Sequence, residues 1–148
     1  VICATNSNVP VFDGDWIEPG QHVITVVGSN SALVKAGWLE RGRRENDDKT
    51  VERADFIVTN HLESISQDEQ AGLWEPLQEG LITWDKIFAL GAVLNGDHPG
   101  RTSDEQITYH FNNHGTAAAD LALAQIVYNR AKKEGRGMGI EIPAPGTQ

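Results

Sequence analysis

The chain of 148 residues is poor in the features that mark several classes of protein. Its single cysteine, Cys3, allows no disulfide within the chain, and apolar neighbours indicate a buried thiol that needs no oxidising compartment. No apolar run is long enough to span a bilayer, and the N-terminus lacks the basic and hydrophobic regions of a signal peptide. These absences lead us to expect a cytoplasmic protein.

Positive charge is also scarce. Lysine and arginine number 12 against 21 aspartates and glutamates, which gives a formal net charge of −9. The field of such a protein repels both the phosphates of nucleic acids and the surfaces of anionic membranes. We therefore expect no nucleic-acid partner and no membrane partner.

Several sequence motifs that carry chemistry are missing. One cysteine and five scattered histidines form no zinc pattern, so no metal site is expected. The chain has neither a nucleophile elbow nor a Walker-type phosphate loop. A Gly-x-Gly-x-x-Gly motif after a strand is absent too, because the glycine-dense stretch 135–139 follows a helical pattern and is interpreted as a helix stop.

What the chain does contain is an alternation of strand and helix patterns in one domain-sized length. Residues 61–96 predict two or three short helices that pack on one face of a sheet, and 31–46 predict a loop that carries four cations. Strands alternating with helices predict an α/β fold with a mostly parallel sheet. The other predicted elements are strands at 1–5, 22–27, 55–60 and 106–111, a short helical turn at 13–17, helices at 47–54 and 116–134, and a possible last strand at 140–142.

The central stretch is 22–30, where β-branched residues run directly into a loop that begins with Gly28, Ser29 and Asn30. This is the pattern of a buried parallel strand whose end lies at the ligand-binding edge of an open sheet. A second loop, 112–115, follows the strand predicted at 106–111 and opens a long helix. Right-handed crossovers would bring both loops to the same edge and form a nucleotide crevice. The alternative is that both are ordinary turns.

Two further features have alternative interpretations. His114 could serve as an acid or base at neutral pH, or be a solvated loop histidine. The cations Lys35, Arg41, Arg43 and Arg44 could meet a phosphate or carboxylate, or lie in a surface loop. Val1 is not an initiator methionine, so we expect the natural protein to begin upstream, although processing after a lost methionine would give the same start.

An ordered series of short motifs runs nearly from end to end of the chain, at 3–7, 10–11, 20–23, 26–30, 43–45, 54–55, 100–102 and 115–120. Together these motifs resemble the ornithine cyclodeaminase and mu-crystallin family. In that family an NAD(P)-binding Rossmann domain is joined to a substrate and dimerisation domain, and members reduce imines, deaminate alanine or cyclise ornithine. The resemblance covers only the later half of such an enzyme, without the glycine-rich loop and without the first βαβ half.

The resemblance implies a role for particular residues. It makes Val27, Gly28 and Ser29 contacts of the nicotinamide half of NAD or NADP, with Asn113 near the same ring. Asn30 takes the catalytic position at which ornithine-cyclising members use an aspartate. An amide can neither carry that charge nor act as a base, so imine reduction or amino-acid dehydrogenation is favoured over cyclisation. The family's lysine or arginine after the central loop maps to Lys35 or Arg43, a choice that the sequence leaves open.

The resemblance also implies an organisation. Residues 1–134 would form the distal part of an NAD(P)-binding Rossmann-like domain, and 135–148 a C-terminal segment. The expected function is that of the distal part of an NAD(P)-dependent oxidoreductase acting on an amino acid or cyclic imine, with weak or absent cofactor binding in this chain alone. The alternative is a truncated, non-catalytic binding or assembly module. A sheet cut before its first βαβ unit leaves an open edge, so we expect a homo-oligomer.

Overall fold

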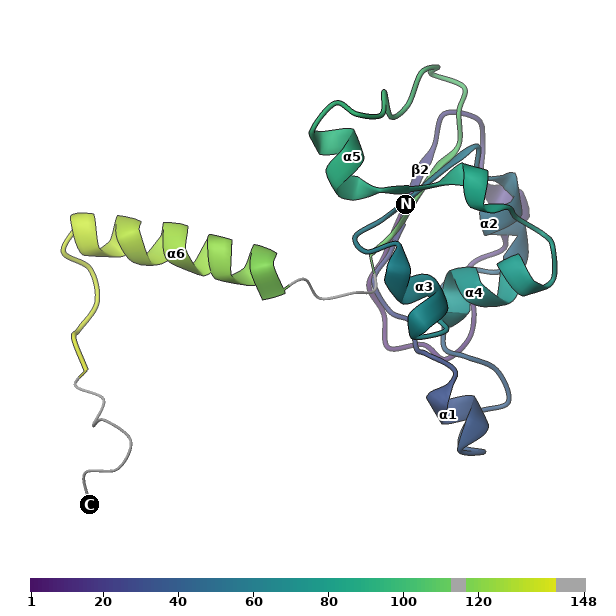
Figure 1. The fold of residues 1–148 in the computed structure, drawn as a ribbon, viewed down its shortest axis with the longest axis horizontal. Helices are drawn as coiled ribbons and strands as arrows, with labels where there is room; N and C mark the ends of the chain where they lie inside the picture. The colour runs from purple at the N-terminus through teal and green to yellow at the C-terminus, as the bar shows by residue number, and fades with distance from the viewer. Residues whose placement is uncertain (113–116, 141–148) are drawn as a thin grey trace. The chain divides into compact units, whose positions relative to one another are not determined.

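A computed structural model describes residues 1–112 and 117–140 of the chain (Figure 1). The chain divides into two compact units, Val1–His114 and Gly115–Gln148, which are described separately below.

The first unit is built on a five-stranded sheet in which every strand pairs in parallel with its neighbours. This confirms the predicted α/β class with a mostly parallel sheet. The strands are shorter than their sequence patterns because each pattern also includes residues of the adjoining loops. In spatial order they are β1 (Ile2–Cys3), β2 (His22–Thr25), β5 (Thr108–Phe111), β3 (Phe56–Thr59) and β4 (Ile87–Ala89).

The strand β4 corrects the prediction of helices throughout 61–96. Three residues are too short to display a period of two, and the apolar residues on either side of them fall at helical spacing. In the structure Ile87 pairs with Ile57 and Phe88 with Val58. Parallel pairing with β3 satisfies the backbone groups of Ile87–Ala89 without a helix.

The helices confirm the other predictions with one addition. The helix predicted at 47–54 is present and begins at a side-chain cap, because Asp47 accepts a hydrogen bond from the Thr50 amide. A short helix, α1, interrupts the loop predicted at 31–46. The helical elements of this unit are η1 (Gly14–Trp16), α1 (Ala32–Lys35), α2 (Asp48–Arg53), α3 (Glu63–Gln67), α4 (Ala71–Gln78), η2 (Trp84–Lys86) and α5 (Leu90–Leu94).

The two faces of the sheet are covered differently. Side chains alternate along a strand, so Val23, Ile57 and Tyr109 share one face. They form a core with residues of the helices between the strands, among them Val51 and Leu73. The opposite face is covered by α5, which corrects the expectation that the helices of 61–96 pack on one face.

The second unit contains one long helix, α6 (Ala117–Lys133), which confirms the helix predicted at 116–134. Every described residue of this helix is exposed except Ala131, which is half-buried. No helix in the described part of the chain has the length and apolar character needed to cross a membrane. The large exposed apolar side chains of α6 are Leu121, Leu123, Ile126, Val127 and Tyr128.

Candidate functional site

The last residues of β2 and β5 lie side by side at the carboxyl edge of the sheet. Thr25 and Phe111, the last residues of these strands, are paired, and the Asn112 amide donates to the Thr25 carbonyl over 2.9 Å. This is the arrangement predicted from right-handed crossovers. The residues of the second loop from Asn113 onward, with His114, lie outside the described residues.

The loop after β2 is held from two sides. Gly28 forms an isolated antiparallel bridge with Arg44, and the Ser29 hydroxyl accepts a hydrogen bond of 2.8 Å from the Arg43 amide. The Ser29 carbonyl in turn accepts from the Ala71 amide, at the start of α4, over 3.0 Å. The backbone of this loop is therefore fixed by residues that arrive from 43–45 and from α4.

Beneath this loop lies a buried carboxylate that the sequence analysis did not single out. Glu45 has an exposed fraction of 0%. Its Oε2 accepts from the amides of Val26 and Val27 over 2.8 and 2.9 Å. Its Oε1 accepts from both the amide and the hydroxyl of Thr5. Glu45 thus joins the ends of β1 and β2 through one side chain.

Asn30, the proposed catalytic position, lies just beyond the loop on a polar surface hollow of about 250 Å³. Its side chain is exposed, and its Oδ1 accepts a hydrogen bond of 3.1 Å from the Ala32 amide. This is the local turn geometry that asparagine favours. Lys35 lines the same hollow and pairs with Glu69 at 2.5 Å.

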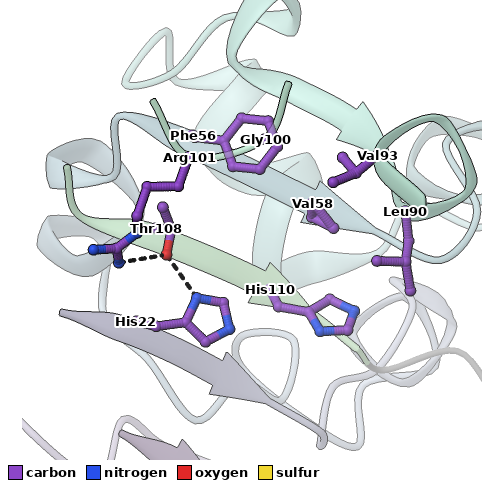
Figure 2. A pocket seen from close by; sticks show the side chains of 9 residues that line it. All are labelled: His22, Phe56, Val58, Leu90, Val93, Gly100, Arg101, Thr108 and His110. Carbon is purple, nitrogen blue, oxygen red and sulfur yellow. Dashed lines mark hydrogen bonds between the residues drawn. The ribbon is translucent and has the colours of Figure 1, made fainter. Parts of the chain in front are cut away.

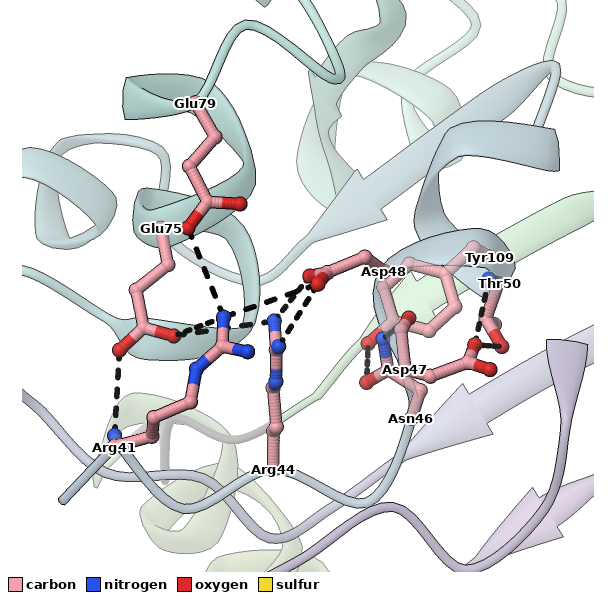
Figure 3. Close-up of polar contacts among 10 residues, drawn as sticks. Arg41, Arg44, Asn46, Asp47, Asp48, Thr50, Glu75, Glu79 and Tyr109 are labelled. Atoms are coloured by element: carbon pink, nitrogen blue, oxygen red, sulfur yellow. Dashed lines mark hydrogen bonds and ion pairs between the residues drawn. The ribbon is translucent and has the colours of Figure 1, made fainter. Parts of the chain in front are cut away.

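The cations of 31–46 are engaged within the protein. Arg43 donates to the side chain of Asn6 over 2.6 Å, so Lys35 and Arg43 point to different partners. Arg41 and Arg44 belong to an ion-pair cluster that joins 41–48 to α4 (Figure 3). The Arg44 side chain is 5% exposed and makes a two-pronged contact with Asp48, at 2.5 and 3.1 Å.

Figure 3 also shows a buried hydrogen bond between Tyr109 of β5 and Asn46. The Tyr109 hydroxyl donates to Asn46 over 2.7 Å. It also lies 2.8 Å from the Thr25 hydroxyl. Burial raises the pKa of this phenol, so Tyr109 stays protonated. These contacts satisfy polar groups that would otherwise be buried without partners.

A separate cavity of about 330 Å³ lies on the α5 face of the sheet (Figure 2). Its apolar wall is formed by Phe56, Val58, Leu90 and Val93. The other wall is polar. Its Thr108 hydroxyl lies 2.7 Å from Nδ1 of His22 and accepts a hydrogen bond of 3.2 Å from Nη2 of Arg101. The cavity begins at the first residues of β2, β5 and β3, so it is a different place from the loops at the carboxyl edge.

Both histidines of this cavity have lowered pKa values. Burial is the main cause for each; the N-terminal ammonium and Arg101 add to the effect at His22, and His22 adds to it at His110. Neutral imidazoles are therefore favoured at pH 7. Among the described residues, no three histidine, cysteine, aspartate or glutamate side chains come together in a group that could hold a metal ion.

We expect acid to destabilise the protein in two stages. Lowered histidine pKa values contribute stability above the ordinary value of 6.5 that is lost as the pH falls. Burial opposes the charged forms of Glu45 and Asp47, but backbone and side-chain hydrogen bonds outweigh it and leave both pKa values below their ordinary 4.5 and 3.8. A second loss therefore begins below about pH 4.5.

The measurement is the urea midpoint from pH 7.5 to pH 3. Asp47→Asn should reduce the second stage to the part that Glu45 contributes and leave the first unchanged, because the carboxylate that it removes titrates only in the acid range. A midpoint independent of pH between 4.5 and 3 would contradict the role given to these carboxylates.

Comparison with known proteins adds to this geometry. The model of the ornithine cyclodeaminase/mu-crystallin family matches residues 1–135. The Δ1-pyrroline-2-carboxylate reductase of Bacillus cereus is 31% identical over 143 residues, which are 96% of this chain and 40% of that protein.

Solved structures give the same picture. The structure of Thermococcus litoralis Δ1-pyrroline-2-carboxylate reductase in complex with NADH and L-proline matches with a TM-score of 0.74 and 29% identity, covering 94% of this chain and 39% of that one. An archaeal alanine dehydrogenase dimer with bound NAD matches with a TM-score of 0.72 and 27% identity, covering 96% and 40%. The chain thus spans about 40% of the length of these relatives.

Proposed function

The chain belongs to the ornithine cyclodeaminase/mu-crystallin family, and from this membership we propose that it forms the nicotinamide-binding, distal part of an NAD(P)-dependent oxidoreductase. Residues 1–134 would be the distal part of the Rossmann-like domain, with 135–148 as a C-terminal segment. The observation that carries the proposal is the meeting of the ends of β2 and β5 at the carboxyl edge of a parallel sheet.

The donors of the β2 loop support the nicotinamide end of the cofactor over its pyrophosphate. The amides of Val26 and Val27 donate to Glu45, and the Ser29 amide donates to the Arg43 carbonyl. A loop that binds phosphate instead turns its N–H groups toward the ligand. We therefore propose that Val27, Gly28 and Ser29 contact the nicotinamide ring, with Asn113 near the same ring.

The chemistry itself would be the cofactor's, a hydride transfer to or from the substrate carbon. This chain's residues would hold the ring at the sheet edge and shape the place beside it. Either NAD or NADP fits this role, because the part of the fold that distinguishes them is not among the motifs of the chain.

The substrate proposed is an amino acid or a cyclic imine. Asn30 would meet its nitrogen as a neutral hydrogen-bonding partner, from the rim of the polar hollow that also holds Lys35 and Glu69. In the turn, the Oδ1 of Asn30 accepts a hydrogen bond from the Ala32 amide. The side-chain amide nitrogen of Asn30 is then the group that would donate a hydrogen bond to the substrate nitrogen. An amide in this position favours imine reduction or amino-acid dehydrogenation over ornithine cyclisation.

We also propose a homo-oligomer. The large apolar side chains of α6 are exposed, and Ile2 on the edge strand β1 is 74% exposed. Exposed apolar patches and open strand edges both favour association.

The test of the proposed function is a titration of the ¹⁵N-labelled chain with NADH, followed by NMR. We expect the amide signals of 27–29 and Asn113 to shift, with a dissociation constant weaker than about 100 μM, which corresponds to roughly 5 kcal/mol. Binding should be weak because the turn that grips the pyrophosphate is missing. Nicotinamide mononucleotide should shift the same signals.

Adenosine diphosphate is the matched control, because it carries the other half of the cofactor and should leave 27–29 unchanged. Low-micromolar binding, or shifts confined to other residues, would show that the dinucleotide site is misplaced. An absence of any shift at millimolar NADH would favour the non-catalytic binding or assembly module.

A further inference from the structure

We propose that Glu45 is the positioning residue of the nicotinamide loop, because its buried carboxylate holds the ends of β1 and β2 in a single arrangement. This inference rests on the proposed function and deepens it. It assigns to Glu45 the geometry of residues 26–29, not a contact with substrate or cofactor.

The contacts of the Glu45 carboxylate are divided between two segments. Oε2 receives the amides of Val26 and Val27, which leave β2. Oε1 receives the amide and hydroxyl of Thr5, which follows β1. The first segment is itself the start of the proposed nicotinamide loop, so the carboxylate fixes this loop relative to the neighbouring strand end.

Only an ionised carboxylate can make this set of contacts. Both oxygens accept, and each receives two donors. A glutamine at this position would present an NH₂ group to one pair of donors, since its amide has a single oxygen. Burial without compensation would favour the neutral acid, but the hydrogen bonds keep the pKa of Glu45 below its ordinary value.

The backbone around Glu45 carries the effect further along the loop. Its neighbours Arg43 and Arg44 hold Ser29 and Gly28, and the Glu45 carbonyl accepts from the Val11 amide over 2.9 Å. A displacement at Glu45 therefore moves the supports of the whole loop. Positioning errors of about 1 Å can cost about a hundredfold in rate at such sites.

Asp47 provides a matched control two residues away. It is also a carboxylate with several donors, namely the Gly14 amide at 2.9 Å, the Thr50 amide at 2.9 Å and the Thr50 hydroxyl at 2.8 Å. These donors belong to η1 and α2, not to the ends of β1 and β2. Asp47→Asn should weaken the fold without releasing the nicotinamide loop.

The experiment compares amide hydrogen exchange in the full chain and in its Glu45→Gln and Asp47→Asn variants. Relative to core amides of the same variant, Val27 should exchange at least about tenfold faster in Glu45→Gln, and Val26, which also donates to the Cys3 carbonyl over 3.2 Å, should show a smaller increase. Both ratios should be unchanged in Asp47→Asn. In the NADH titration, Glu45→Gln should weaken the response of 27–29 by at least about threefold, and Asp47→Asn should leave it unchanged.

If Glu45→Gln does not fold, Thr5→Val removes one of the four donors and should give a smaller change in the same direction. Unchanged relative exchange at Val26 and Val27, in whichever variant folds, would overturn the proposal. A wild-type chain that does not respond to NADH would overturn the proposed function alone, because the exchange ratios still decide whether Glu45 fixes the loop.

Discussion

Replacing Asp48 by alanine is expected to destabilise the protein by about 3 kcal/mol, whereas Glu79→Ala should cost less than about 1 kcal/mol. Each change removes one negative charge from the same ion-pair cluster (Figure 3). The difference arises because Asp48 pairs with the buried Arg44, while Glu79 pairs only with Arg41, whose side chain is 55% exposed.

Removing the partner of a buried cation leaves its charge without compensation, which is the costly way to break such a pair. The cost at Asp48 stays at the lower end of the usual range because Glu75 lies 3.9 Å from Arg44. The quantity to measure is the free energy of unfolding of each variant, obtained by urea titration.

A double variant separates the pair from the rest of the site. Adding Arg44→Met to Asp48→Ala should recover part of the lost stability, since an apolar side chain of similar length replaces an unpaired buried charge. Equal losses in Asp48→Ala and Glu79→Ala would show that burial of Arg44 does not strengthen its contact with Asp48.

This cluster also shows where sequence reasoning stops. The loop predicted at 31–46 is rich in charges, and one of its two interpretations is a surface loop, yet Arg44 and Glu45 are buried. A charged residue is buried only when partners compensate it, and the partners of Glu45 are 18, 19 and 40 residues away. Nothing in the local pattern signals such distant pairings.

The meeting of the ends of β2 and β5 could be predicted without knowledge of any particular contact, because a general rule of topology applies to it. A β-branched run followed by glycine marks the end of β2, and parallel strands connected by right-handed crossovers bring their ends together. The register of β2 with β5 confirms that these two strand ends lie together at one edge of the sheet. The roles of Val27, Gly28, Ser29, Asn30 and Asn113 remain predictions.

The cavity on the α5 face could not be predicted, because it depends on strand order. β5 inserts between β2 and β3, although it follows both of them in the sequence. This order brings His110 beside Ile24 and Val58, and Thr108 beside His22 and Phe56. A sequence pattern gives the faces of each strand but not its neighbours.

A second large effect is expected in the core beneath the two loops, where Phe111→Ala should destabilise the protein by about 3–5 kcal/mol. Phe111 ends β5 and is 2% exposed. Its ring packs against the backbone of α4, since a Cβ added at Gly72 would lie 2.5 Å from the Phe111 Cε2. The neighbouring Ala71 amide is the one that holds Ser29.

The contact between Phe111 and Gly72 can be tested by combining the two sites. Gly72→Ala alone should be destabilising, because the gain in helix propensity, about 1 kcal/mol, is smaller than the cost of forcing a methyl group into a packed ring. In the Phe111→Ala background the same change should be stabilising, since the methyl group enters the space that the ring has left. Phe88→Ala, at a half-buried ring of the edge strand, serves as the control and should show no such coupling to Gly72. If Gly72→Ala has the same effect with and without the Phe111 ring, α4 does not pack on Phe111, and the support that this helix gives to Ser29 is independent of the core below it.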